Sequence, residues 1–208
     1  MVLLPGATIP LHIFEPRYRQ MLHDCLVTDR RFGLILAPED TGDRFPSGHV
    51  GCIAHVESSE ALADGRSNIL ITGEERFALD RLLEIDTPYL IGAVTVVEDL
   101  PEEPAANAEL ADSVCALFER AAQAARTLSN DRLPIPELSP EPTLLAFRVA
   151  LFVDFDVEDR QRLLASRSPR ERLAHVHALL AEALPALEAR AAIHRRAKTN
   201  GHGPHDDD

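Results

Sequence analysis

The sequence predicts an α+β protein, with a small antiparallel β-barrel or sandwich and one early helix in its first half and an α-helical bundle in its second. Two observations support this class. Before residue 100, about six short apolar segments follow one another at intervals of roughly 8–15 residues, with turn residues between them. From Glu109 onward the apolar spacing is helical and rich in alanine. We therefore expect a β lobe over residues 1–104, a helical lobe over residues 105–198 and a disordered polar tail over residues 199–208.

The first strand and the early helix meet at Glu15 and Pro16. Apolar residues alternate over residues 9–14, which is the period of a strand. Pro16 suits the first position of a helix, where its missing N–H costs nothing. Beyond it, apolar residues recur with helical spacing up to Leu26, and Glu15 complements the positive end of the helix dipole. We therefore predict a sharp turn from strand to helix, and a helix that buries one apolar face.

Five further strands are expected, over residues 32–36, 50–57, 68–72, 76–79 and 88–98. Asp64 and Gly65 predict a tight hairpin turn, because glycine tolerates the positive φ that such turns demand. Gly73 is expected to break the strand that returns from this turn. Gly92 predicts a bulge or a close backbone approach in the last strand.

A linker over residues 100–107 precedes four expected helices. The second of them, over residues 143–153, is apolar nearly all round and should be buried. Asp156 is predicted to cap the third helix. The sequence Ser-Pro-Arg-Glu that begins at Ser168 is a capping box, so the fourth helix should start there. Pro185 lies inside this last helix and predicts a kink or a break.

The formal net charge of −13 opposes binding to nucleic acids and to anionic membrane surfaces. The charge is uneven, since residues 1–104 carry 8 basic and 18 acidic side chains. Any peptide that binds the β lobe by charge should therefore be basic. The sequence contains one lysine, Lys198, so it holds neither a Walker A phosphate loop nor the buried lysine of a Ser–Lys protease. No catalytic residue and no cofactor are expected.

The three cysteines, Cys25, Cys52 and Cys115, are far apart in the sequence, and each lies in an apolar pattern. Buried free thiols are therefore expected, which fits a reducing compartment. The N-terminus lacks the basic segment of a signal peptide, and no apolar run is long enough to span a membrane. A cytoplasmic protein is predicted. His175 and His177 are two residues apart in a helix and do not face each other, so no metal site is expected.

Several motifs occur in one order along the chain. VLLPGATIPLHIFEPRYRQML opens it, and LADGR (residues 62–66), GEERF (73–77) and PYLIGAV (88–94) follow. The helical segment VEDRQRLLASRSPRERLAHVHALLAEAL, residues 157–184, completes the series. Together these motifs resemble the N-terminal domain of Lon proteases, and the resemblance covers most of residues 2–187.

The resemblance implies a β-barrel-like lobe of the PUA-like kind, followed by a helical bundle. In full Lon proteases this region helps to select substrates and to assemble the hexamer, while the ATPase module and the Ser–Lys protease domain lie downstream. The chain is therefore identified as a member of the stand-alone Lon substrate-binding-domain proteins. The function this implies is non-enzymatic recognition of exposed or unfolded protein segments, or of a protein partner such as a protease or chaperone, and an oligomer is compatible with it. Two alternatives stay open: a peptidase-associated enzyme activity, and a small-molecule or nucleic-acid binder of the PUA-like class.

The structural signature of the family falls on Glu15, Pro16, Arg17, Arg19, Arg76 and Phe77. We expect the three arginines to contact Glu15 or backbone carbonyls rather than a bound anion, because the acidic chain does not attract anions. The candidate binding residues are Arg44 and Phe45, in the polar loop over residues 38–49, because interface hot spots favour aromatic residues and arginine. Phe45 either anchors a partner or folds back onto the barrel.

Family members usually carry one more strand upstream of the VLLPGA segment. This chain starts at Met1, and without that strand a sheet edge would be exposed. We therefore expect the true translation start to lie further upstream.

Overall fold

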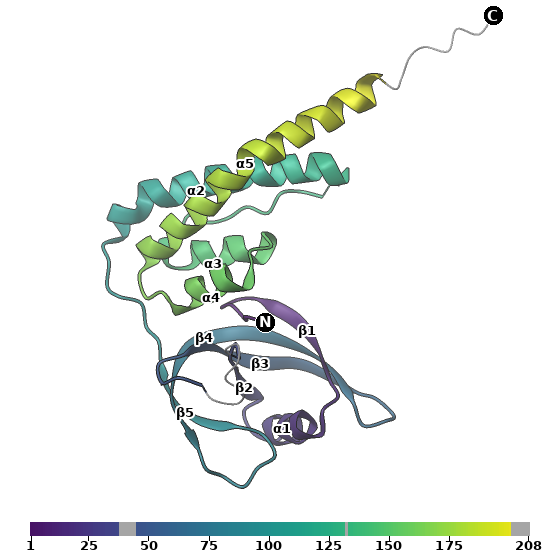
Figure 1. Cartoon of the computed structure of the whole chain (residues 1–208), viewed down its shortest axis with the longest axis vertical. Coiled ribbons are helices and arrows are strands. Elements are labelled where there is room, and N and C mark those ends of the chain that lie inside the picture. The colour runs from purple at the N-terminus through teal and green to yellow at the C-terminus, as the bar shows by residue number, and fades with distance from the viewer. Residues whose placement is uncertain (38–44, 132, 201–208) are drawn as a thin grey trace, which may run out of the picture. The chain divides into compact units, whose positions relative to one another are not determined.

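The computed structural model describes residues 1–37, 45–131 and 133–200, within which five strands and five helices form (Figure 1). In chain order these are β1 (Thr8–Ile13), α1 (Pro16–Leu26), β2 (Arg31–Leu34), β3 (Val50–Ala61), β4 (Ser67–Leu83), β5 (Ile91–Val96), α2 (Pro104–Ser129), α3 (Pro142–Phe152), α4 (Val157–Ala165) and α5 (Pro169–Asn200). Residues 199 and 200 of the predicted tail belong to α5, and the rest of that tail lies outside the described residues.

The chain forms two compact units. The sheet unit contains Met1–Leu100 and Ala150–Arg167, and the helical unit contains Pro101–Val149 and Ser168–Asp208. This division differs from the boundary expected at residue 104, because α4 belongs to the sheet unit. Within that unit, Gln161 Nε2 of α4 donates a hydrogen bond of 2.9 Å to the carbonyl oxygen of Val50 at the start of β3. Such a long-range contact has no signature in sequence spacing.

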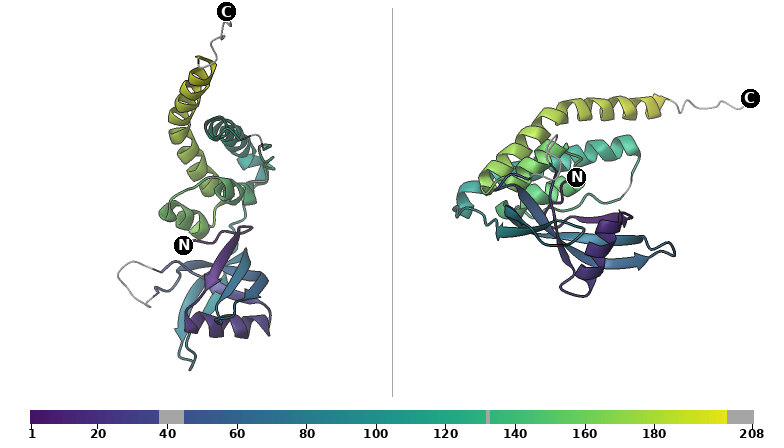
Figure 2. Two further views of the ribbon diagram at one scale, coloured as in Figure 1. Left: turned by 90° about the vertical axis from the view of Figure 1, so that its right-hand side faces the viewer. Right: turned by 60° about the horizontal axis from the view of Figure 1, so that its bottom comes forward.

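The sheet unit is a curled antiparallel half-barrel with α1 at one end of the sheet (Figures 1 and 2). β3 pairs with one side of β4, and β2 pairs with the far side of β3. β1 and β5 both pair with the other side of β4, β1 along residues 67–72 and β5 along residues 77–83. β1 and β5 are therefore two edge strands that follow one another along β4. This architecture confirms the predicted α+β class.

β4 is continuous, so the break predicted at Gly73 is wrong, and the described residues form five strands where about six are expected. The register with β3 shifts just after Gly73, which places an extra residue in β4. A Cβ atom on Gly73 would lie 2.3 Å from the carbonyl oxygen of Leu4. Glycine is required there because the N-terminal backbone approaches the strand closely, not because the strand ends.

The three cysteines are free thiols, as predicted, but of the three only Cys52 is buried. Burial raises the pKa of the Cys52 thiol to about 12. Cys25 and Cys115 are half-buried, and burial is also the main cause of their raised pKa. All three thiols are therefore protonated at neutral pH, and none is prepared to act as a nucleophile.

In the helical unit, α2 packs along α5. α2 begins at Pro104 rather than near Glu109, so the predicted linker is too long; Pro104 lies in the first turn, where proline is tolerated. α3 is buried along much of its length, as predicted. α5 continues through Pro185 without a break, although its ribbon changes direction along its length (Figure 2).

The start of α5 is fixed by polar contacts. The Ser168 hydroxyl oxygen accepts a hydrogen bond of 3.1 Å from the backbone N–H of Glu171, as the predicted capping box requires. The same hydroxyl donates to the Glu102 carboxylate at 2.5 Å. One turn into the helix, Arg172 is fully buried and donates from Nη2 to the carbonyl oxygen of Thr143 at 2.7 Å.

Candidate functional site

The signature residues at the start of α1 make local structural contacts. Glu15 occupies the N-cap position and Pro16 the first turn, as the sequence predicts. Arg17 pairs with the Glu15 carboxylate at 2.9 Å and lies 4.5 Å above the ring of Tyr18. Arg19 lies against the turn between β3 and β4, because a Cβ atom on Gly65 would come within 2.1 Å of its Nη2 atom. The structure thus brings the side chain of Arg17, rather than that of Arg19, to the Glu15 carboxylate.

Arg76 is buried in the sheet unit, with 6% of its side chain exposed. It donates to the carbonyl oxygens of Leu164 and Ser166 at 3.0 and 2.5 Å, and to the Asp99 carboxylate at 2.5 Å. These contacts hold the end of α4 to β4. The neighbouring Phe77 is also buried, and its ring fills the space above Gly51, where a Cβ atom would lie only 2.5 Å away.

The structure places one of the two candidate binding residues. Arg44 lies outside the described residues. Phe45 is half-buried, and its ring centroid lies 6.3 Å from that of His49. His49 is fixed to the sheet, because its backbone carbonyl accepts a hydrogen bond of 2.9 Å from the N–H of Leu79 in β4. Phe45 therefore lies beside the end of β4 that carries β5, and its role in binding stays a prediction.

The described residues contain no group of three or more His, Cys, Asp or Glu side chains that could hold a metal ion. His177 instead forms a hydrogen bond of 3.0 Å with the hydroxyl of Ser113. Glu74, at the turn of the GEERF motif, pairs with Arg31 at 2.9 Å. No helix in the same part of the chain is long and apolar enough to span a membrane.

Cavities in both units have volumes that could hold a ligand. The first, of about 750 Å³, lies in the helical unit between α2, α5 and the segment that follows α2. Arg120 and Glu188 face each other at its wall through two hydrogen bonds of 3.0 Å. The second, of about 650 Å³, lies in the sheet unit beside Met1 and residues 154–160. Charged side chains line much of both cavities, so neither resembles the mostly apolar pocket that small ligands prefer.

An exposed apolar surface lies on the hairpin of β4 and β5. We call it the apolar hairpin surface and define it by Ile85, Leu90, Val94 and Val96, residues that are 50%, 49%, 45% and 59% exposed. β5 itself, with the sequence IGAVTV, contains neither a charged residue nor proline. The sequence pattern predicts only a strand here. The run of uncharged residues in β5 is the signal that could have marked it as a candidate binding site. Exposed apolar side chains grouped in this way are typical of interaction sites.

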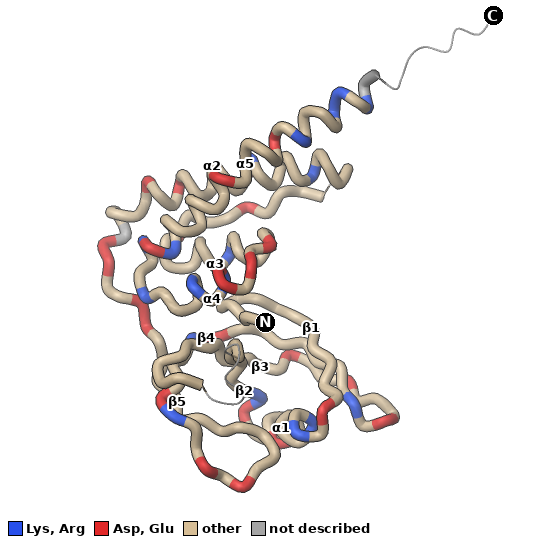
Figure 3. Tube along the Cα trace, in the orientation of Figure 1, with Lys and Arg blue, Asp and Glu red and all other residues tan. Residues whose placement is uncertain are grey.

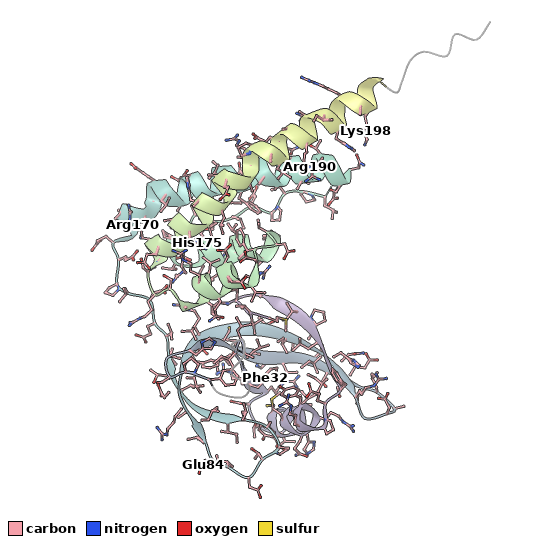
Figure 4. The ribbon with its side chains drawn as sticks, in the orientation of Figure 1. Phe32, Glu84, Arg170, His175, Arg190 and Lys198 are labelled. Carbon is pink, nitrogen blue, oxygen red and sulfur yellow. The ribbon has the colours of Figure 1, made fainter. Side chains whose placement is uncertain are left out.

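Carboxylates surround the apolar hairpin surface. Asp80, Glu84, Asp86 and Glu98 are all exposed, and Arg81 is the one basic residue in this part of the sequence. Figure 3 shows the acidic positions on this hairpin, and Figure 4 shows Glu84 at its tip. The surface therefore combines apolar side chains with a negative charge, which favours a partner that is apolar and basic.

The half-barrel with one early helix and the helical unit together define an α+β chain. The chain belongs to the family of the ATP-dependent protease La (LON) substrate-binding domain, whose family model matches residues 1–182. The resemblance to Lon N-terminal domains that the motifs predict is thereby confirmed.

Relatives and solved structures agree with this assignment. Lon protease 1 of Thermus thermophilus is 29% identical over 206 residues, which are 95% of this chain and 25% of that protein. Lon protease of Xanthomonas oryzae pv. oryzae is 28% identical over 203 residues, 96% of this chain and 24% of that protein. The chain thus spans about a quarter of the length of the curated relatives it matches.

Two solved structures share the fold. The Lon N-terminal domain protein from Xanthomonas campestris superimposes with a TM-score of 0.58 at 26% identity, covering 85% of this chain and 92% of that one. The N-terminal domain of the Mycobacterium avium complex Lon protease gives a TM-score of 0.61 at 21% identity, covering 86% and 92%.

Proposed function

We propose that this chain is a non-catalytic recognition domain that binds exposed or unfolded apolar segments of other proteins. The observation that carries the proposal is the apolar hairpin surface, in which four large aliphatic side chains stand in solvent on one hairpin. Its acidic surroundings add a preference for basic segments. The family to which the chain belongs is named for substrate binding, which supports the same function.

Catalysis is not part of the proposal. The raised pKa of the buried Cys52 thiol, to about 12, argues against that residue as a nucleophile. Glu74 is engaged with Arg31. We further propose that the protein is cytoplasmic, because its three cysteines are free thiols, which suit a reducing compartment. A protease or chaperone is the kind of partner that would receive a bound segment.

The test compares an unfolded protein with its native form. The probe is reduced, carboxamidomethylated lysozyme, which cannot refold and keeps its positive net charge, and binding to the full chain is measured by fluorescence anisotropy. We expect binding to the unfolded probe and not to native lysozyme, which has the same basic residues in a folded form. The double variant Ile85→Ser/Leu90→Ser should weaken this binding about 10-fold, which is about 1.4 kcal/mol.

Val27→Ser is the matched control, because Val27 is 71% exposed but lies at the end of α1, outside the apolar hairpin surface. Surface substitutions of this kind change folding stability little. Phe45→Ala, measured in the same assay, tests the predicted anchor separately. Equal binding by the wild type and the double variant, or no binding of the unfolded probe at all, would contradict the proposal.

A further inference from the structure

The direction of the backbone groups in β5 follows from its pairing with β4. The N–H of Leu79 donates to the carbonyl oxygen of His49 at 2.9 Å, and its own carbonyl accepts from Gly48 at 2.7 Å. Leu79 therefore faces the β3 side of β4. In an antiparallel ladder, successive residues direct their backbone groups to opposite sides. Ala78, the preceding residue, thus faces β5.

Thr95 is paired with Ala78, so its backbone groups point toward β4. Its neighbours Val94 and Val96 must then direct their N–H and C=O groups away from the sheet. The hydrogen bond of 2.9 Å from the N–H of Val97 to the carbonyl oxygen of Arg76 fits the same alternation. Among the residues that the structure describes, no strand pairs with this outer side of β5.

The same two residues are exposed to solvent, Val94 to 45% and Val96 to 59%. Each valine thus offers a backbone donor, a backbone acceptor and an apolar side chain to one incoming strand. Edge strands usually carry proline, lysine or another charge that prevents such pairing, and β5 carries none of these. An extended peptide that adds to the sheet would gain main-chain hydrogen bonds and would place alternate side chains on the valines.

We propose that β5 binds an extended polypeptide segment by strand addition at Val94 and Val96, and that the preferred segment alternates apolar residues between basic ends. The inference rests on the proposed function and names its binding mode. The basic ends follow from charge, since Glu84 and Asp86 lie before β5 and Glu98 lies after it. A second copy of this chain is a poorer occupant, because edge-to-edge pairing would bring two acidic hairpins together.

The probe is the fluorescein-labelled peptide KKTVTVTVKK, titrated with the full chain at low salt. Two control peptides each change one property. EETVTVTVEE reverses the charges at the ends and keeps the central residues. A third peptide has its six central backbone amides N-methylated, which removes the hydrogen-bond donors but leaves the side chains. We expect measurable binding of the first peptide, at least 10-fold weaker binding of the acidic peptide, and loss of binding for the N-methylated one.

The matching change in the protein is Val94→Pro. Because the Val94 N–H points outward, this substitution removes the donor to the incoming strand without removing a bond to β4. Thr8→Pro is the control: the N–H of Gly73 donates to the carbonyl oxygen of Ala7 at 2.9 Å, so the next residue, Thr8, faces outward from β1 in the same way. We expect Val94→Pro to lose at least 10-fold in affinity, and Thr8→Pro to bind like the wild type.

The outcomes separate this inference from the proposed function. If Val94→Pro and the N-methylated peptide both bind like their parents, strand addition is wrong, whereas binding of carboxamidomethylated lysozyme would still support the proposed function. Self-association of the wild type that Val94→Pro abolishes, seen by sedimentation velocity, would assign the edge to a second copy and overturn the inference. If Val94→Pro lowers the melting temperature, its loss of binding could reflect a loss of folded protein. The N-methylated peptide then decides whether strand addition occurs, since it leaves the protein unchanged.

Discussion

β1 and β5 pair with the same side of the same strand, yet their outer edges differ. In β1 the residues that face outward are Thr8, Pro10 and His12, by alternation from Ala7, whose carbonyl bonds to Gly73 in β4. Pro10 has no N–H, so the middle of this edge cannot donate to another strand. In β5 the outward positions, Val94 and Val96, both keep their donors. Pro10 therefore makes the β1 edge resistant to pairing, whereas the β5 edge has no proline and can pair with another strand.

The backbone in β4 beside β1 is packed more tightly than the backbone of β5, and substitutions at the glycine in each place give the largest expected effect. A Cβ atom on Gly73, beside β1, would lie 2.3 Å from the backbone oxygen of Leu4, which cannot move easily. A Cβ atom on Gly92, in β5, would lie 2.6 Å from a terminal carbon of Leu79, which can rotate away. We expect Gly73→Ala to lower the free energy of unfolding by about 3 kcal/mol and Gly92→Ala by about 1 kcal/mol.

Urea denaturation of the two glycine variants checks this difference. A free energy of unfolding that falls as much for Gly92→Ala as for Gly73→Ala would show that the backbone beside β1 and the backbone of β5 are equally constrained. In that case the expected difference in packing, with less room for a Cβ atom at Gly73 than at Gly92, would be wrong.

A smaller effect is expected at the connection between the β5 hairpin and α1. The Tyr89 hydroxyl donates a hydrogen bond of 2.7 Å to the Asp24 carboxylate, and this bond raises the pKa of Tyr89 above its usual value. Because the folded state raises this pKa, the stabilisation is fully present below the pKa of the unfolded tyrosine, about 10, and is lost as the pH rises through the raised value. Tyr89→Phe should therefore cost about 1 kcal/mol at neutral pH, and the difference from the wild type should vanish in alkali.

Thermal denaturation at about pH 7 and above about pH 10 measures this dependence. Tyr18→Phe is the matched control, because the contact that the structure gives Tyr18 is made by its ring, 4.5 Å from Arg17, and the substitution keeps that ring. A difference between Tyr89→Phe and the wild type that stays constant across this pH range would mean that the hydroxyl of Tyr89 does not hold the hairpin.

Local signals in the sequence predicted the helix starts well. Pro16 begins α1, the Asp156 carboxylate accepts a hydrogen bond of 2.8 Å from the N–H of Asp159, and Ser168 caps α5. Each of these features depends on residues within one turn, so short-range chemistry is sufficient to find it.

Long-range features could not be predicted in this way. Gly73 has the local pattern of a strand break, but its actual role depends on the approach of Leu4, many residues away in the sequence. The buried Arg172 and the Glu102 contact with Ser168 join segments that are equally distant. The same holds for the candidate site: whether Val94 and Val96 face a neighbour or solvent depends on which strands pair with β4, and no residue of β5 encodes that choice.

The most direct test of an open β5 edge is the hydrogen exchange of its individual backbone amides, measured by NMR with and without the peptide KKTVTVTVKK. The amide of Thr95 should exchange slowly in both states, because it faces β4. The amides of Val94 and Val96 should exchange rapidly in the free protein and become protected when the peptide binds. Slow exchange of the two valine amides in the free protein, or no added protection with saturating peptide, would contradict this account.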